Sequence, residues 1–297
     1  MKYRQRNMPM TLKAAALLLV PLVAGCGNGG GGGVTLPSFG SGSTLGSLIG
    51  GKAGQTADVV GKVGAAELLS QADEDEMGRT VAIAATNQWP LYDNPALTKY
   101  VTMVGLTLAD STSNPSGNWV FGILDTPELN AYSGPNGYIL ITRGAIAAMQ
   151  DESELAGVIA HEMAHVLNHD GFNAVKNARR NQALLEGAAA MDQKFAAFSQ
   201  ASDFLVNTVL RSGWDKSQET AADAGAVKIL KTAGYDATGL ARFLKRMEQS
   251  HGGGSGKLFG THPGTPDRIA RISSQAGPAG GATHVARFTK ARSAANL

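Results

Sequence analysis

The chain has 297 residues, and its 26 lysines and arginines nearly balance its 24 aspartates and glutamates. The basic residues are scattered along the sequence, so the charge pattern does not indicate nucleic-acid binding. Cys26 is the only cysteine, which excludes an intramolecular disulfide. Beyond an unusual N-terminal segment, roughly 240 residues remain, and this length suits one domain around one hydrophobic core.

The N-terminal segment has the pattern of a bacterial lipoprotein signal. Basic residues precede an apolar run over 14–23, and small residues then lead directly to Cys26. The run is too short to span a bilayer as a helix. We therefore expect residues 1–25 to be a signal peptide and Cys26 to become a lipidated first residue that anchors the protein to a membrane. Gly27, rather than Asp, follows this cysteine, and the resemblance to the enterobacterial sorting pattern favours a periplasm-facing lipoprotein of the outer membrane.

The next segment, residues 26–56, is rich in glycine and serine, so we expect a flexible tether. The folded domain should then extend over 57–275. Its first part predicts two helices and two strands from the spacing of apolar residues. The helices are expected at 57–88 and 94–110, and the strands at 118–124 and 137–142, connected through Asn130-Ala131-Tyr132 and a turn-like stretch at 133–137.

Residues 161–165 read His-Glu-Met-Ala-His and place two histidines and a carboxylate on one helical surface. At about 100° per residue, His161 and His165 lie roughly 40° apart and can reach one ion. Glu162 lies roughly 100° from His161, which suits contact with a water on that ion. Zinc prefers such ligands with one position open to water. The alternative is a surface helix with solvated histidines. However, an Asp-x-x-Glu start favours a helix over 152–169, and its apolar opposite face indicates that one side packs in the core while the other carries the histidines.

A third ligand is expected downstream, because Gly171 occupies the position where a metzincin would carry its third histidine. Glu219 and Asp223 lie four residues apart on a helix expected at about 215–234. Two acids among apolar residues are costly to bury unless they meet cations or donors. Glu219 as the third ligand and Asp223 as the acceptor of a ligating histidine's outer N–H would satisfy both. The alternative is an ordinary solvated helix face.

The remaining sequence predicts further helices and a disordered end. Residues 172–210 are apolar but interrupted by charges, so no span there is expected to cross a bilayer. Helices are expected at 238–250 and, after a Thr-Pro start, at 266–274. The tail at 276–297, which contains glycine and proline, is expected to be disordered.

Several blocks in this order resemble the HtpX-like and CAAX-prenyl-protease-like zinc metallopeptidases. The nearest similarity is to the periplasmic BepA and LoiP branch and its mitochondrial Oma-type relatives. The blocks extend from roughly residue 73 to 274 and comprise Asn130-Ala131-Tyr132, Gly137 to Gly144, His161-Glu162-x-x-His165, Glu219-x-x-x-Asp223, Thr261-His262-Pro263 and Arg268-Ile269. The resemblance implies an α+β, mainly α-helical, zincin-like metallopeptidase domain of the gluzincin type, with a small β-sheet beside the His-Glu-x-x-His helix. It further implies one Zn²⁺ per chain held by His161, His165 and Glu219, with Glu162 as the catalytic base.

The function that this resemblance implies is a zinc metalloendopeptidase of the cell envelope that cleaves misfolded or misassembled proteins. Glu162 would take a proton from the attacking water and deliver it to the leaving amine. Tyr132, His262 and Arg268 are candidate donors to the oxyanion, and spacing assigns none of them. The substrate is expected to add a strand to an exposed sheet edge. That edge is expected near Tyr132, formed by Gly137, Tyr138, Ile139 and Leu140.

Two other functions and three roles for His262 stay open. The chain could be a zinc-stabilised chaperone or assembly factor for outer-membrane proteins, although the intact Glu162 counts against this, or an amidase acting on cell-wall peptides. His262 lies between a glycine-rich run and two prolines, and could be a regulatory fourth ligand, an oxyanion donor or a structural residue. Similarity to BepA-type enzymes, in which the corresponding motif acts as a regulatory switch, favours the fourth ligand.

Overall fold

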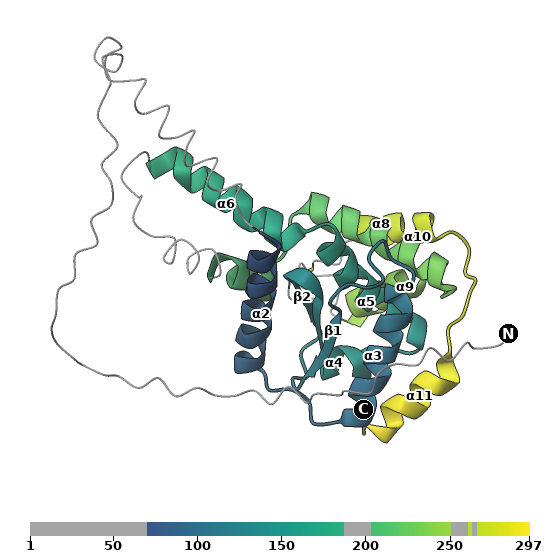
Figure 1. Ribbon diagram of the computed structural model, residues 1–297. Helices are drawn as coiled ribbons and strands as arrows, with labels where there is room; N and C mark the ends of the chain where they lie inside the picture. The colour runs from purple at the N-terminus through teal and green to yellow at the C-terminus, as the bar shows by residue number, and fades with distance from the viewer. Residues whose placement is uncertain (1–69, 187–202, 251–260, 263–265) are drawn as a thin grey trace, which may run out of the picture. The chain divides into compact units, whose positions relative to one another are not determined.

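A computed structural model of the chain describes residues 70–186, 203–250, 261–262 and 266–297 (Figure 1). The expected signal peptide, Cys26, the tether and the first part of the expected domain, up to residue 69, lie outside the described residues. Within the described part of the chain, no helix is both long and apolar enough to cross a membrane.

Helices dominate the fold and surround a small mixed sheet, which confirms the mainly helical α+β architecture expected from the sequence. The elements, in chain order, are α2 (Gln71–Gln88), α3 (Pro95–Ala109), β1 (Val120–Leu124), β2 (Ala131–Gly134), the short 3₁₀ helix η1 (Pro135–Gly137), β3 (Tyr138–Thr142), α4 (Arg143–Ala148), α5 (Glu152–Leu167), α6 (Asp170–Glu186), the π-helical turn η3 (Thr208–Ser212), α8 (Lys216–Ala233), α9 (Gly239–Ser250), α10 (Pro266–Ala276) and α11 (Val285–Ala294).

The sheet has the strand order β1-β3-β2, and this topology corrects two expectations. Residues 131–134, expected to be part of a connection, form strand β2, which pairs antiparallel to β3. The expected exposed edge from Gly137 to Leu140 is wrong, because β3 is the central strand and also pairs in parallel with β1. Its backbone groups are therefore engaged on both sides. The strand beside α5 that has only one described strand partner is β2.

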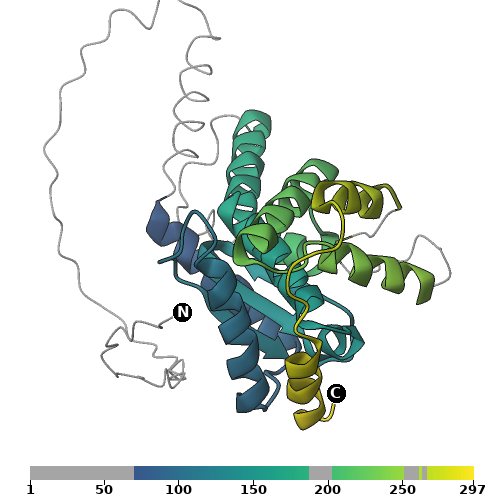
Figure 2. The same ribbon diagram turned by 90° about the vertical axis from the view of Figure 1, so that its right-hand side faces the viewer.

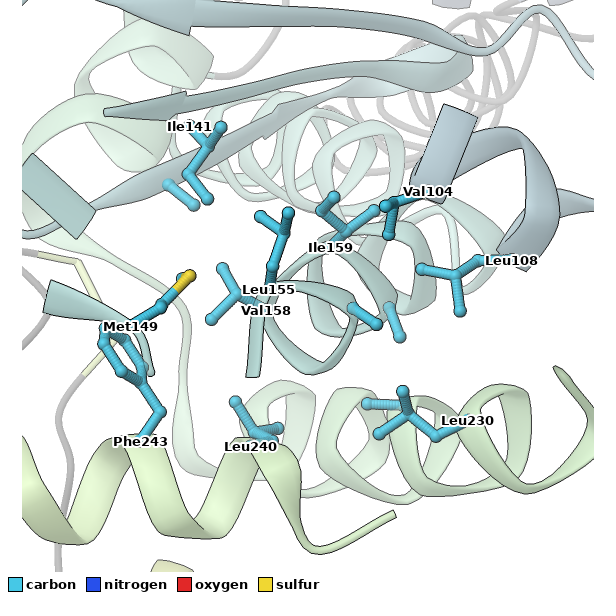
Figure 3. Close-up of a cluster of buried hydrophobic side chains, with 14 of the residues drawn as sticks. Val104, Leu108, Ile141, Met149, Leu155, Val158, Ile159, Leu230, Leu240 and Phe243 are labelled. Carbon is cyan, nitrogen blue, oxygen red and sulfur yellow. The ribbon is translucent and has the colours of Figure 1, made fainter. Parts of the chain in front are cut away.

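Each face of the sheet is covered by its own helices. Directly opposite residues of paired strands share a face, so Tyr132 and Leu140 lie together on one side and pack with Met77 and Val81 of α2. On the other side, Ile141 packs into a larger cluster with side chains of α3, α4, α5, α8 and α9 (Figure 3). Figure 1 shows the same arrangement, with α2 on one side of the strands and α3 and α5 on the other.

Helix α5 lies at the centre of this larger cluster and packs most extensively against α8. Its start is fixed locally, because the Asp151 side chain accepts a hydrogen bond from the backbone N–H of Glu154. The approach of α8 requires a small residue: a Cβ on Gly225 would lie 2.7 Å from the Cβ of Ala164 on α5. Helix α8 begins with a capping box at Asp215 and ends at the left-handed Gly234. Both helices therefore begin and end close to the bounds expected from the sequence.

The expected disorder of the tail is wrong, because this part of the chain forms α11 and packs beside α3 (Figures 1 and 2). Phe288 is only 1% exposed and joins the larger cluster. Arg287 pairs with Glu152, the fully buried first residue of α5. Glu152 also accepts hydrogen bonds from the hydroxyls of Tyr100, at 2.5 Å, and Tyr235, at 2.6 Å. The C-terminal helix thus holds the start of α5 through one buried carboxylate.

Replacing Arg287 with Gln is expected to lower the free energy of unfolding by about 1–3 kcal/mol at neutral pH, because Glu152 loses its cationic partner. Burial opposes ionisation of Glu152, but hydrogen bonds from Arg287, Tyr100 and Tyr235 hold its pKa below the ordinary value. This stabilisation is present above the unfolded-state pKa, about 4.3, and is lost as pH falls through the folded-state pKa. The difference between variant and wild type, measured by urea unfolding, should therefore shrink in acid. Lys290→Gln, at an exposed position of the same helix, is the control and should unfold like the wild type.

Candidate metal centre and active site

Helix α5 supplies three polar side chains to one buried site. His161, Glu162 and His165 are all almost fully buried, which is unusual for such residues unless they have partners. The Nε2 atoms of the two histidines lie 3.2 Å apart, as the spacing of four residues along one helix allows. The carboxylate of Glu162 projects beside them from the adjacent position.

The other side of the site comes from α8 and from the segment before α10. Glu219, in the first turn of α8, brings one oxygen to 3.5 Å from His161 Nε2 and the other to 3.6 Å from His165 Nε2. His262 places its Nδ1 2.6 Å from Glu219 Oε1 and 3.3 Å from His161 Nε2. One ligand atom from each of these four residues lies within 4.8 Å of all the others.

These distances fit a tetrahedral metal site. Two ligands that are each bound about 2.0–2.1 Å from zinc lie about 3.3–3.4 Å apart when the geometry is tetrahedral. The two histidine nitrogens lie 3.2 Å apart, and each has a different oxygen of Glu219 at 3.5 or 3.6 Å, which is close to this value. The donor set of two imidazole nitrogens and one carboxylate oxygen is also the chemistry that zinc prefers. The residues present are therefore compatible with a metal ion.

The balance of charge in the site also favours a cation. Four buried carboxylates lie in or beside it, on Glu162, Asp170, Glu219 and Asp223, whereas Arg268 is the one buried arginine or lysine among the described residues. Burial and the charge of Arg268 oppose protonation of His161, but Asp223 and Glu219 outweigh them and raise its pKa to about 9. The same carboxylates that favour a proton on this imidazole favour a metal ion beside it.

Each histidine of α5 directs its second ring nitrogen towards an aspartate. The Nδ1 of His161 lies 3.1 Å from Asp223 Oδ1, and the Nδ1 of His165 lies 2.7 Å from Asp170 Oδ2. Such carboxylates fix the ring orientation and tautomer, which leaves Nε2 available to a metal. Asp170 was not identified from the sequence. Asp170 comes after a break in the helix at His169, whose φ is 54°. The helical spacing of α5 therefore does not predict that Asp170 lies beside His165.

Arg268, expected as a candidate donor to substrate, lies behind the ligands. Its Nε and Nη2 contact the carboxylate of Asp223 at 2.8–3.1 Å, and its Nη1 lies 2.8 Å from Glu219 Oε2. The guanidinium is 3% exposed. These contacts favour a role in holding two carboxylates in place over direct contact with substrate.

Tyr132, the other candidate donor, has its side chain on the opposite face of the sheet from α5. Its ring stacks on Trp89 at 5.5 Å between centroids and is 2% exposed. The cause is the alternation of side chains along β2, which directs Tyr132 towards α2 and its neighbour Ser133 towards α5. The backbone of Tyr132 remains on the strand nearest the site, but its ring packs in the smaller cluster.

Comparison with known proteins identifies the family. The sequence profile of peptidase family M48 matches residues 95–276, which is more than half of the chain. The chain belongs to peptidase family M48. The matched region contains all the residues of the centre described above.

Three curated relatives illustrate the range of the similarity. The beta-barrel assembly-enhancing protease of Escherichia coli O157:H7 is 25% identical over 74% of this chain and 48% of its own length. A protease HtpX homolog of Salinibacter ruber is 34% identical over 48% of this chain and 62% of its own. The mitochondrial metalloendopeptidase OMA1 of Schizosaccharomyces pombe is 26% identical over 59% of this chain and 52% of its own. The chain thus spans about half the length of the assembly-enhancing protease that it matches.

Replacing Asp170 with Asn is expected to weaken zinc affinity about 10–100-fold, because His165 loses the carboxylate that orients its ring. Affinity can be measured by competition with a chromophoric chelator. Asp267→Asn, an exposed position on α10, is the control and should bind zinc like the wild type. Equal affinity in the Asp170 variant and the wild type would show that this carboxylate does not support the metal site.

Proposed function

We propose that the protein is a zinc-dependent metalloendopeptidase of the bacterial cell envelope, with one zinc ion held by His161, His165 and Glu219. The observation that carries this proposal is the position of Glu162, a buried carboxylate directly beside the cluster of candidate ligands. A purely structural zinc site has no need of that extra acid. When bound, zinc would supply a Lewis acid that polarises the scissile carbonyl and acidifies water.

Glu162 is suited to act as the general base. Burial opposes its ionisation, but positive charge at His262, His161 and His165 holds its pKa below the ordinary value. A zinc ion bound by these imidazoles would act in the same direction, so the carboxylate would be able to accept a proton. It would take the proton from the attacking water and pass it to the leaving amine. The neighbouring Asp223 and Asp170 hold the histidines, and Arg268 holds Glu219 and Asp223, so the reacting groups need little rearrangement.

Substrate recognition is proposed at β2 and not at the central strand β3. Strand β2 has only one strand partner among the described residues. An extended peptide can pair with such a strand, and backbone pairing of this kind accepts many side chains. Strand β2 lies against α5, so a peptide added there would pass close to Glu162. This mode suits an enzyme that removes unfolded or misassembled proteins, and the name of the beta-barrel assembly-enhancing protease of Escherichia coli fits a substrate in the envelope.

The place of action is proposed from the N-terminal sequence and from the bacterial relatives. Lipidation at Cys26 would anchor the protein to the outer membrane of a Gram-negative cell, with the catalytic domain facing the periplasm. A tether of some 30 residues would let the domain reach roughly 30 Å from the lipid. Misassembled envelope proteins would lie within that range.

A Glu162→Gln variant should retain zinc and its fold, but its turnover number should fall by a factor of at least about 100, because the general base is removed. Cleavage of casein or gelatin, followed with and without a chelator, measures the activity, and atomic absorption measures the zinc. The alternatives separate in the same assay: a chaperone would leave casein intact in the wild type, whereas an amidase would cleave cell-wall peptides instead. Full activity in the zinc-loaded variant would refute the assignment of Glu162.

We further propose that His262 is a fourth ligand that holds the enzyme latent. Its imidazole lies between the ligands and the base, with Nδ1 in hydrogen-bonding contact with Glu219 and Nε2 3.3 Å from Glu162 Oε1. It therefore occupies the space in which a substrate carbonyl and a water would have to meet. An oxyanion donor would have to vacate the same place first.

His262→Ala is accordingly expected to cleave an unfolded substrate faster than the wild type, with unchanged zinc content. If His262 were instead an oxyanion donor, the same substitution would lower turnover about 10²–10³-fold. Initial rates on fluorescent casein distinguish the two. His284→Ala, at an exposed histidine before α11, is the control for loss of an imidazole. Slower cleavage at full zinc occupancy would reject latency.

A further inference from the structure

Strand β2 carries a buried serine on the face that packs against the metal helix. Ser133 pairs with Ile139 across the sheet, so it shares a face with Ile139 and, two residues along each strand, with Ala131 and Ile141. Those three neighbours belong to the apolar cluster that includes α5. A hydroxyl at this position, 4% exposed, stands in an otherwise apolar row.

The Ser133 hydroxyl has no hydrogen-bond partner among the described residues. One oxygen of Glu162, Oε2, is likewise buried without a hydrogen bond from any described residue, while its other oxygen faces His262. Strand β2 packs against α5, and Ser133 lines one small cavity together with His165, which lies three residues after Glu162 on that helix. The two buried polar atoms without partners therefore lie on packed elements beside the candidate metal centre.

A packing role does not account for this serine. A buried hydroxyl without a hydrogen bond destabilises the folded state relative to an apolar group of similar size. Alanine would fit the row formed by Ala131 and Ile139 without that cost. Unsatisfied groups in otherwise well-packed proteins concentrate at sites where function requires them.

We infer that Ser133 is a positioning residue for the peptidase reaction, whose hydroxyl donates to Glu162 and directs the other carboxylate oxygen towards the reacting water. A hydroxyl can rotate to donate in this direction without moving the strand. The carboxylate would otherwise be free to turn about its terminal bond, for which rotation is broad. Because Ser133 lies on β2, addition of a substrate strand to the same edge would couple peptide binding to the orientation of the base. This inference rests on the proposed catalytic role of Glu162.

The test compares Ser133→Ala, Ser133→Thr and the wild type as full-length, zinc-loaded proteins on a quenched fluorogenic peptide that the wild type cleaves. Ser133→Ala should lower kcat about 10–100-fold with little change in KM and in zinc content, since a hydrogen bond to a charged group is lost. Ser133→Thr retains the hydroxyl and should restore most of kcat. In the Glu162→Gln background, Ser133→Ala should have no further effect, because the serine acts through that carboxylate.

Three results would overturn the inference. They are an unchanged kcat in Ser133→Ala, an effect confined to KM, and a loss in the Glu162→Gln background equal to that in the wild type. A wild-type protein that cleaves no peptide would instead refute the proposed function, and the two failures are thereby distinguished.

Discussion

The burial of four carboxylates and one arginine in the same region is the constraint on which the site depends. Taking such groups out of water is costly unless each meets a cation or a donor. Here α8 brings Glu219 and Asp223 close to the histidines of α5 because Gly225 and Ala164 leave room for the helices to approach. Arg268 offsets part of the negative charge. The imidazoles of His161 and His165 contact Glu219, Asp223 and Asp170. The remaining excess is the feature that a divalent cation would neutralise.

The central helix is held at both ends, so the orientation of its ligands is fixed by the whole domain. At its start, Glu152 meets Arg287, Tyr100 and Tyr235, which come from three separate parts of the chain. Just beyond its end, His169 Nδ1 lies 2.8 Å from the buried Glu74 of α2. A helix clamped in this way cannot easily rotate, and a rotation of one residue would carry His161 and His165 away from Glu219. Precision at the site is thus a property of remote contacts.

Sequence patterns predicted the parts of this arrangement that depend on local rules. Asp151 and Asp215 cap helices through contacts within three residues, and Gly234 ends one through its own conformation. The patterns failed where partners lie far apart in sequence. β2 has only four residues and includes serine and glycine, so it lacks the alternation of a typical strand. The central position of β3 depends on its pairing with β1 and β2, and no local sequence pattern specifies that pairing. Helix α11 depends on a partner 135 residues away.

His262 and Arg268 lie close together in sequence but would have different roles at the site. Both contact Glu219, but through different oxygens: His262 approaches Oε1, and Arg268 approaches Oε2. Withdrawal of the imidazole would therefore leave the guanidinium in contact with both Glu219 and Asp223. The ligand set would keep its geometry while the space beside Glu162 became accessible. Such a division lets a site be closed by a single side chain without being dismantled, since the contacts that maintain the carboxylates differ from the contact that blocks the base.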